Sequence, residues 1–246
     1  MGKHFEDKKA LEHVMGKRIE GMASFSESHG TELPGYLSAA CDSTRETAVV
    51  LLLLWLFLSL LNVSSHQIFM VFTAFGLGWV AWKAGRSGWL GWSRLERLHR
   101  LIEQEKYEIV HHRPQEREEL MALYEAKGFE GKLLDSVVDV LMADQDRLLK
   151  VMLEEEMGLT LQAFEHPLQQ CLGAAIGAAF ALMVSGVFLF FIPSFGVLLS
   201  TFLLLGASAF FSALYEGNEV IPTVIWNLSI AILTLGVAYF VFRILL

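Results

Sequence analysis

Long apolar runs alternate with polar segments along this chain, and the runs predict five membrane-spanning helices at residues 47–63, 68–85, 170–192, 195–214 and 222–245. Each run approaches or exceeds the length that a helix needs to cross the hydrocarbon layer. The first two runs are joined by the short connection "SSHQ", which predicts an antiparallel hairpin. The last three follow one another, with Pro193 and the segment "YEGNE" at the turns.

The polar segment between the second and third spans has the periodicity of helices. "WSRLERLHRLIEQEKYEIVHH" continues the second span and is expected to stop at Pro114, and "PQEREELMALYEAKG" begins with proline and ends with glycine. "GKLLDSVVDVLMAD" and "DQDRLLKVMLEEEMGL" complete four short helices. The sequence therefore predicts an all-α integral membrane protein, with five transmembrane helices and a helical cytoplasmic domain inserted between the second and third.

The predicted organisation has four parts. Residues 1–38 form a polar N-terminal tail with a short helix, and 39–85 hold the first two transmembrane helices. Residues 86–166 form the inserted domain, and 167–246 hold the last three spans. We expect no cleavable signal peptide, because an apolar core and a small-residue cleavage site do not follow Met1.

Composition and charge narrow the class of protein. Apolar residues make up 54% of the chain, and the formal net charge of -8 argues against a nucleic-acid partner, which needs a basic surface. The two cysteines have no zinc-site spacing and predict no disulfide framework. A basic cluster at the end of the second span and after it places that side of the membrane in the cytoplasm; its members are Lys83, Arg86, Arg94, Arg97 and Arg100.

Residues 86–166 carry seventeen of the 27 acidic residues, and several of these are spaced to share a helix face. Glu105 and Glu108 are three apart, as are Glu116 and Glu119, and His112 lies four beyond Glu108. One interpretation is an ordinary solvated acidic face. The other is a site for a hard cation, because clustered carboxylates repel one another unless a cation neutralises them.

Two further features bear on which ion such a site would take. Met152 and Glu156 are four apart on the last predicted helix of the domain, and a thioether favours a softer ion such as Fe²⁺. Glu108 and His111 form a Glu-x-x-His pair, the spacing of di-iron carboxylate bundles, which leaves a di-iron ferroxidase as an alternative. On the next predicted helix the corresponding pair is not a Glu-x-x-His, because Glu116 is followed three residues later by Glu119.

The chain resembles the vacuolar iron transporter family over roughly residues 84–246. The resemblance is strongest in "EKYEIVHHRPQEREELMALYEAKGF" and "VLMADQDRLLKVMLEEEMGL", and it continues through "HPLQQCLGAAIGAAFALMVSGVFLFFIP". It implies a homodimer of five-span subunits, embedded in membrane lipid, that moves Fe²⁺ or Mn²⁺ out of the cytoplasm in exchange for protons. It implies a transporter, which is not an enzyme and uses no organic cofactor.

The family's metal-binding glutamates fall by this resemblance on residues of the inserted domain, which becomes a cytoplasmic metal-binding domain. The implied ligands are Glu105, Glu108, Glu116, Glu119, Met152 and Glu156, with His111 and His112 as candidate accessory ligands. A bacterial inner membrane and a vacuolar membrane are both compatible with the sequence.

The first two spans depart from the family pattern. The second span contains no acidic residue, and "KAGRSGW" stands where the family carries an acid. Asp42 and Glu46, four apart at the start of the first span, are the remaining candidates for the pore mouth, or else for a favourable helix N-terminus. An intramembrane carboxylate usually serves an ion pathway, so its loss raises a second hypothesis: a membrane-tethered iron buffer or sensor that does not transport.

The third span contains Gly173 and Gly177, four apart in "GAAIG". Small residues at this spacing allow two helices to approach closely. Packing within one subunit and contact between two subunits of a dimer are both consistent with the pattern.

Overall fold

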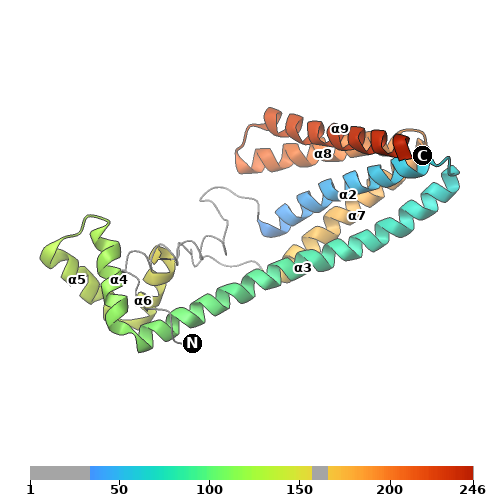
Figure 1. The fold of residues 1–246 in the computed structure, drawn as a ribbon. Coiled ribbons are helices and arrows are strands. Elements are labelled where there is room, and N and C mark those ends of the chain that lie inside the picture. Colours follow the sequence, from blue (N-terminus) through green and yellow to red (C-terminus); the bar gives the residue numbers. More distant parts are fainter. Residues whose placement is uncertain (1–33, 157–165, 246) are drawn as a thin grey trace. The chain divides into compact units, whose positions relative to one another are not determined.

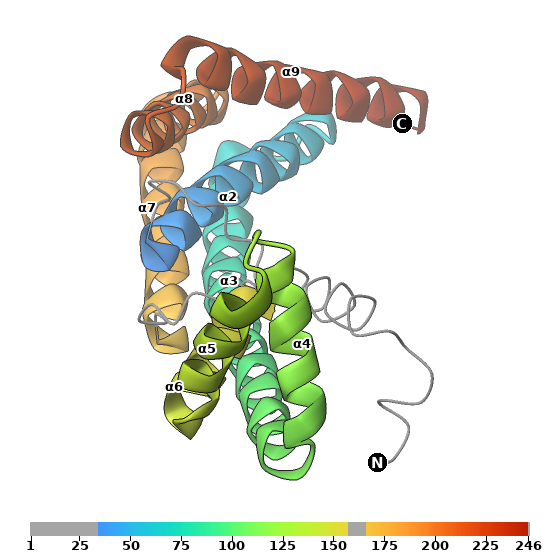
Figure 2. The same ribbon diagram turned by 90° about the vertical axis from the view of Figure 1, so that its left-hand side faces the viewer.

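A computed structural model describes residues 34–156 and 166–245, so the helix predicted in the N-terminal tail lies outside the described residues. Every regular element in the described part is a helix. The described residues form two compact units: one contains residues 93–156, and the other contains residues 34–92 and 166–245. Figure 1 and Figure 2 show the helices of each unit.

Five helices in the described part are long and apolar enough to cross a membrane, as the sequence predicts. They are α2 (Gly35–Leu60), α3 (Ser65–His111), α7 (Pro167–Phe191), α8 (Gly196–Glu216) and α9 (Val220–Leu245). α2 begins twelve residues before the predicted start at residue 47, directly after Pro34. No proline or glycine interrupts the chain between Gly35 and Leu60, so the polar residues of this segment continue the helix instead of preceding it.

The second span and the helix that follows it are one continuous element, α3, as the sequence pattern indicates. α3 ends at His111, and α4 (Arg113–Glu125) starts two residues later with Pro114 in its first turn. Proline has no backbone N–H and its ring clashes with the carbonyl four residues earlier, so it does not continue a helix, yet it is well accommodated in the first turn of one. The break therefore lies at His112, just ahead of the predicted stop.

The closest helix pair in the membrane unit is α2 and α7, which lie side by side in both views (Figures 1 and 2). A Cβ atom on Gly173 would come within 2.0 Å of the Tyr36 carbonyl oxygen, and one on Gly177 within 2.1 Å of the Ala40 carbonyl oxygen. Thr44 also donates a hydrogen bond across this contact to the Gly177 carbonyl, at 3.1 Å. The two glycines thus pack within one subunit.

Hydrogen bonds of hydroxyl side chains connect the helices of the membrane unit. Thr201 on α8 donates to the Ala48 carbonyl at 3.2 Å, and Trp79 on α3 donates through Nε1 to Thr47 Oγ1 at 3.1 Å. Ser87 on α3 donates to the Gln170 carbonyl of α7 at 3.1 Å. Interhelical contacts of this kind replace the hydrophobic driving force that is missing between helices in lipid.

α9 packs on α8, and the C-terminal end of α9 also contacts the C-terminal part of α2. There the ring centroids of Phe57 on α2 and Phe242 on α9 are 5.1 Å apart. An apolar cluster of α2, α3, α7 and α8 fills the interior beneath; its buried members include Leu51, Leu52, Phe72, Leu189 and Val197.

The second unit contains the C-terminal part of α3, then α4, α5 (Gly131–Met142), α6 (Gln145–Val151) and the π-helix η1 (Met152–Glu156). α4, α5 and α6 gather into one group in both views. Their apolar faces form a common core with α3 and η1; it includes Ile109, Leu120, Val138, Leu148 and Met152. Asp144 caps the N-terminus of α6, and its carboxylate accepts a hydrogen bond from the Arg147 amide at 2.8 Å.

Candidate functional site

Four glutamates that the sequence singles out are buried in the small helical unit. Glu105 and Glu116 are 0% exposed, Glu119 is 3% exposed and Glu108 is 5% exposed. Oε1 of Glu105 and both carboxylate oxygens of Glu116 have no contact with solvent. Glutamate is almost never fully buried without compensation, so an ordinary solvated acidic face does not describe these residues.

The amphipathic pattern of the helices explains this burial. Ile109 on α3 and Leu120 on α4 belong to the apolar core of the unit, and each lies four residues after a buried glutamate, on the same helix face. Burying these apolar side chains therefore turns Glu105 and Glu116 inward. The Gln104 amide donates a hydrogen bond to Glu108 Oε1 at 3.0 Å, which orients that carboxylate.

Met152 is 0% exposed in the same core, at the first position of η1. Turns of π-helix are rare in proteins, and many of those that do occur lie at functional sites. Glu156 is the last residue of η1, and its side chain lies outside the described part of the structure.

The two histidines are placed differently from the glutamates. His111 is exposed, its ring stacks on Tyr107 with centroids 3.9 Å apart, and its Nδ1 lies 2.9 Å from the Tyr107 carbonyl oxygen. His112 is half-buried at the break between α3 and α4. The Glu108–His111 pair is thus divided between interior and surface, an arrangement that does not favour a di-iron site.

In the described residues, no three side chains of His, Cys, Asp or Glu are placed to hold one metal ion. The four glutamates share the interior of the unit. Their oxygens are nevertheless the ligand type that hard divalent cations prefer, and the Met152 thioether adds a softer donor. Each ionised carboxylate in such an interior costs several kcal/mol, a cost that a bound cation can offset.

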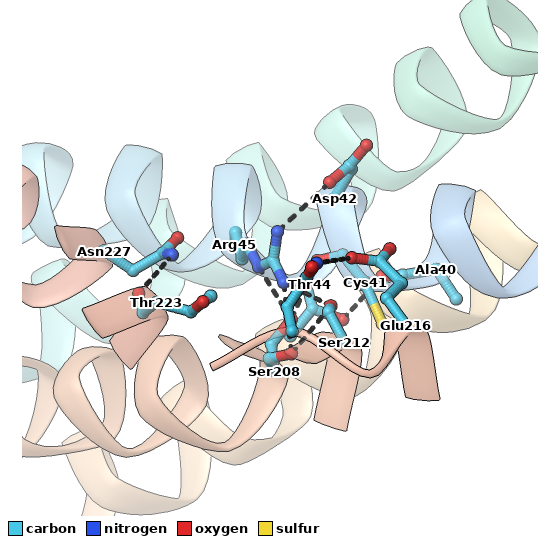
Figure 3. Close-up of polar contacts among 11 residues, drawn as sticks. Ala40, Cys41, Asp42, Thr44, Arg45, Ser208, Ser212, Glu216, Thr223 and Asn227 are labelled. Carbon is cyan, nitrogen blue, oxygen red and sulfur yellow. Dashed lines mark hydrogen bonds and ion pairs between the residues drawn. The ribbon is translucent and has the colours of Figure 1, made fainter. Parts of the chain in front are cut away.

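The two predicted pore-mouth acids lie on α2 in the membrane unit, and both are engaged with basic side chains. Asp42 lies 3.5 Å from Arg45 Nη1 (Figure 3). Arg45 is anchored on α8: its Nε donates to Ser208 Oγ at 3.0 Å, its Nη2 donates to the Ser208 carbonyl at 3.1 Å, and Nη2 also donates to Ser212 Oγ. The guanidinium therefore bridges Asp42 to α8.

Glu46 pairs with Lys83 of α3, whose Nζ lies 2.6 Å from Glu46 Oε2. The Lys83 side chain is 7% exposed, while that of Glu46 is 49% exposed. The ammonium is therefore the buried partner, and it lies inside a segment whose remaining residues from 68 to 85 carry no charge.

Sequence reasoning assigned Lys83 only to a basic cluster that sets membrane orientation, and it assigned no role to Arg45, Ser208 or Ser212. One signal was present: a charged side chain in a transmembrane helix generally faces the bundle interior and has a partner. Ser208 and Ser212, four apart on α8, also share one helix face. Which residues pair with these charged side chains became known only from the packing of α2 against α3 and α8.

Comparison with known proteins adds a family assignment. A family model described as the VIT family matches residues 92–243, well over half of the chain. This match covers most of the stretch over which the sequence resembles the vacuolar iron transporters, and it confirms that resemblance. A comparison with curated proteins finds no match.

Proposed function

Because the chain belongs to the VIT family, a family of membrane metal-ion transporters, we propose that it moves Fe²⁺ or Mn²⁺ out of the cytoplasm. The family and the five apolar helices make it a multi-pass membrane protein. The observation that carries the choice of ion is the burial of Glu105, Glu108, Glu116 and Glu119 in the helical unit whose core also contains Met152. Carboxylates with a thioether suit a divalent ion between the hard and soft extremes.

In this proposal the helical unit is cytoplasmic and collects the ion. The carboxylates of α3 and α4 close around it, with Met152 and Glu156 contributing from η1. The ion replaces the mutual repulsion of four buried acids by attraction, so binding and tighter packing of the unit are coupled. Protonation of the carboxylates at low pH releases the ion, which couples its movement to protons. The subunits pair as a homodimer in the lipid bilayer.

A second candidate function is supported by the ion pairs in the membrane unit. Asp42 and Glu46 already have basic partners, Arg45 and Lys83, so the acids nearest the predicted entrance do not present an uncompensated negative charge. A protein that binds iron in its helical unit and does not transport it, a membrane-tethered buffer or sensor, agrees with this observation.

The test is ion flux into proteoliposomes that contain the purified full-length chain, with Fe²⁺, Mn²⁺ and Zn²⁺ compared across a pH gradient. Equilibrium binding is measured on the same preparations. Flux of Fe²⁺ or Mn²⁺ that depends on the pH gradient supports transport. Binding without flux favours the buffer or sensor and refutes the transport proposal.

The site is tested with a matched pair of double variants. Glu105→Gln with Glu116→Gln neutralises one buried acid on each of α3 and α4, while Glu103→Gln with Glu118→Gln neutralises exposed acids on the same helices. The buried pair is expected to weaken Mn²⁺ binding by at least about tenfold, and the exposed pair by much less. Equal losses from both pairs would contradict a site made of the buried carboxylates.

A further inference from the structure

The membrane unit contains two cations of its own beside the two acids at the predicted entrance. The Arg45 guanidinium is fixed on α8 through Ser208 and Ser212 and contacts Asp42 (Figure 3). The Lys83 ammonium comes from α3 and contacts Glu46. The four side chains together carry no net charge, so this entrance does not concentrate cations as an acidic funnel would.

Arg45 and Lys83 differ in how firmly they are held. Arg45 donates to three oxygen atoms of α8, which fixes it independently of Asp42. The polar contact that the structure gives for Lys83 Nζ is Glu46 Oε2, at 2.6 Å, and the rest of the lysine side chain is almost completely enclosed. Lysine has a compact charge on a flexible stem, and it can withdraw from a carboxylate without breaking a fork of hydrogen bonds.

We propose that Lys83 is the resident cation of Glu46 and controls the access of divalent ions to the transmembrane carboxylates. The ammonium occupies the oxygen that an incoming ion would bind, and its positive charge repels that ion. An ion takes this oxygen of Glu46 only when Lys83 moves away, while Asp42, four residues earlier on the same helix face, is paired with Arg45. This inference rests on the proposed transport through the membrane unit.

The experiment measures Mn²⁺ binding to the full-length chain in lipid nanodiscs by the electron paramagnetic resonance signal of free Mn²⁺. Glu105, Glu108, Glu116 and Glu119 are first replaced by Gln, so that ions held by the helical unit do not obscure the membrane unit. In this parent, Lys83→Met is expected to produce an additional Mn²⁺ site or to tighten membrane-unit binding by at least about tenfold. Adding Glu46→Gln should abolish the gain.

Two controls separate the removal of this ammonium from a general loss of positive charge. Arg86→Met removes a charge from an exposed position three residues later on α3 and should leave Mn²⁺ binding unchanged. Lys83→Arg keeps a cation at the same position and should also bind no additional Mn²⁺. If Lys83→Met does not yield folded protein, Lys83→Gln, which is uncharged and hydrogen-bonding, takes its place.

The inference is overturned if removing the Lys83 charge leaves Mn²⁺ binding equal to that of the parent, or if the gain persists with Glu46→Gln. Failure of the proposed function is seen separately, as absent flux by the unmodified chain in proteoliposomes. A chain without flux whose Lys83→Met variant gains a Glu46-dependent site would refute transport by the natural protein and still support the role of Lys83.

Discussion

Replacing Gly177 with alanine tests the close contact that positions α2, the helix that carries Asp42, Arg45 and Glu46. The new Cβ would lie 2.1 Å from the Ala40 carbonyl oxygen, which is 1.3 Å short of the 3.4 Å at which ordinary contact begins. The obstacle is backbone, so no side chain can rotate away, and α2 and α7 must separate. Overpacking of this kind typically costs about 2 kcal/mol.

For a chain of this size, that cost corresponds to a melting temperature roughly 4–8 °C lower. The assay heats samples of the detergent-solubilised protein to a series of temperatures. The fraction that remains folded is then measured by size-exclusion chromatography with tryptophan-fluorescence detection. Gly186→Ala on the same helix is the matched control, because a Cβ there meets no atom within 4 Å. If the Gly177→Ala and Gly186→Ala variants have the same melting temperature, the glycine contact between α2 and α7 does not determine the packing of the unit.

Three more predictions concern stability. Arg45→Gln removes charged hydrogen bonds to α8 and should cost about 2 kcal/mol in the same melting assay, whereas the exposed Arg86→Gln should leave the melting temperature nearly unchanged. Asp144→Ala removes the α6 N-cap and should cost about 1 kcal/mol, while Asp135→Ala on the exposed face of α5 should have little effect; equal shifts would contradict the capping role. Burial, and after it the negative charge of Glu155, raises the pKa of Tyr124 above its usual value near 10. The neutral tyrosine therefore stabilises the folded state fully below about pH 10, and this contribution is lost as the pH rises through the raised pKa. Tyr124→Phe should therefore flatten the alkaline limb of the melting temperature against pH, and an unchanged limb would show that the tyrosine does not contribute to it.

The buried glutamates of the helical unit and the ion-paired acids of the membrane unit differ in how readily they would accept a cation. In the helical unit, Glu105 and Glu116 are 0% exposed, and on the proposed function this burial favours the uptake of a cation. In the membrane unit, Glu46 is half exposed and already holds an ammonium at 2.6 Å. On the proposed function, the first unit binds the ion readily, and the second admits it only after an internal cation has moved.

The sequence by itself determined the helices and their order. Hydropathy located five spans, the helical repeat located α4, α5 and α6, and Pro114 located the break after α3 to within two residues. These are local properties: span length, periodicity and proline geometry act within a few neighbouring residues. The N-terminal boundary of α2 was missed because a polar start to a helix does not differ locally from a polar segment before one.

Only the tertiary structure decided which faces meet. The i, i+3 spacing of Glu116 and Glu119 is compatible with a solvated helix face and with an interior one. The packing of α4 in the core of the helical unit places both residues in the interior. The Gly173 and Gly177 spacing suited either a neighbouring subunit or α2, and contact with Tyr36 and Ala40 chose α2. Lys83 lies 37 residues from Glu46, and Arg45 lies 163 residues from Ser208, so no local pattern could have paired them. Contacts between distant residues are set by the way that whole helix surfaces fit together, and that information is distributed over several helices.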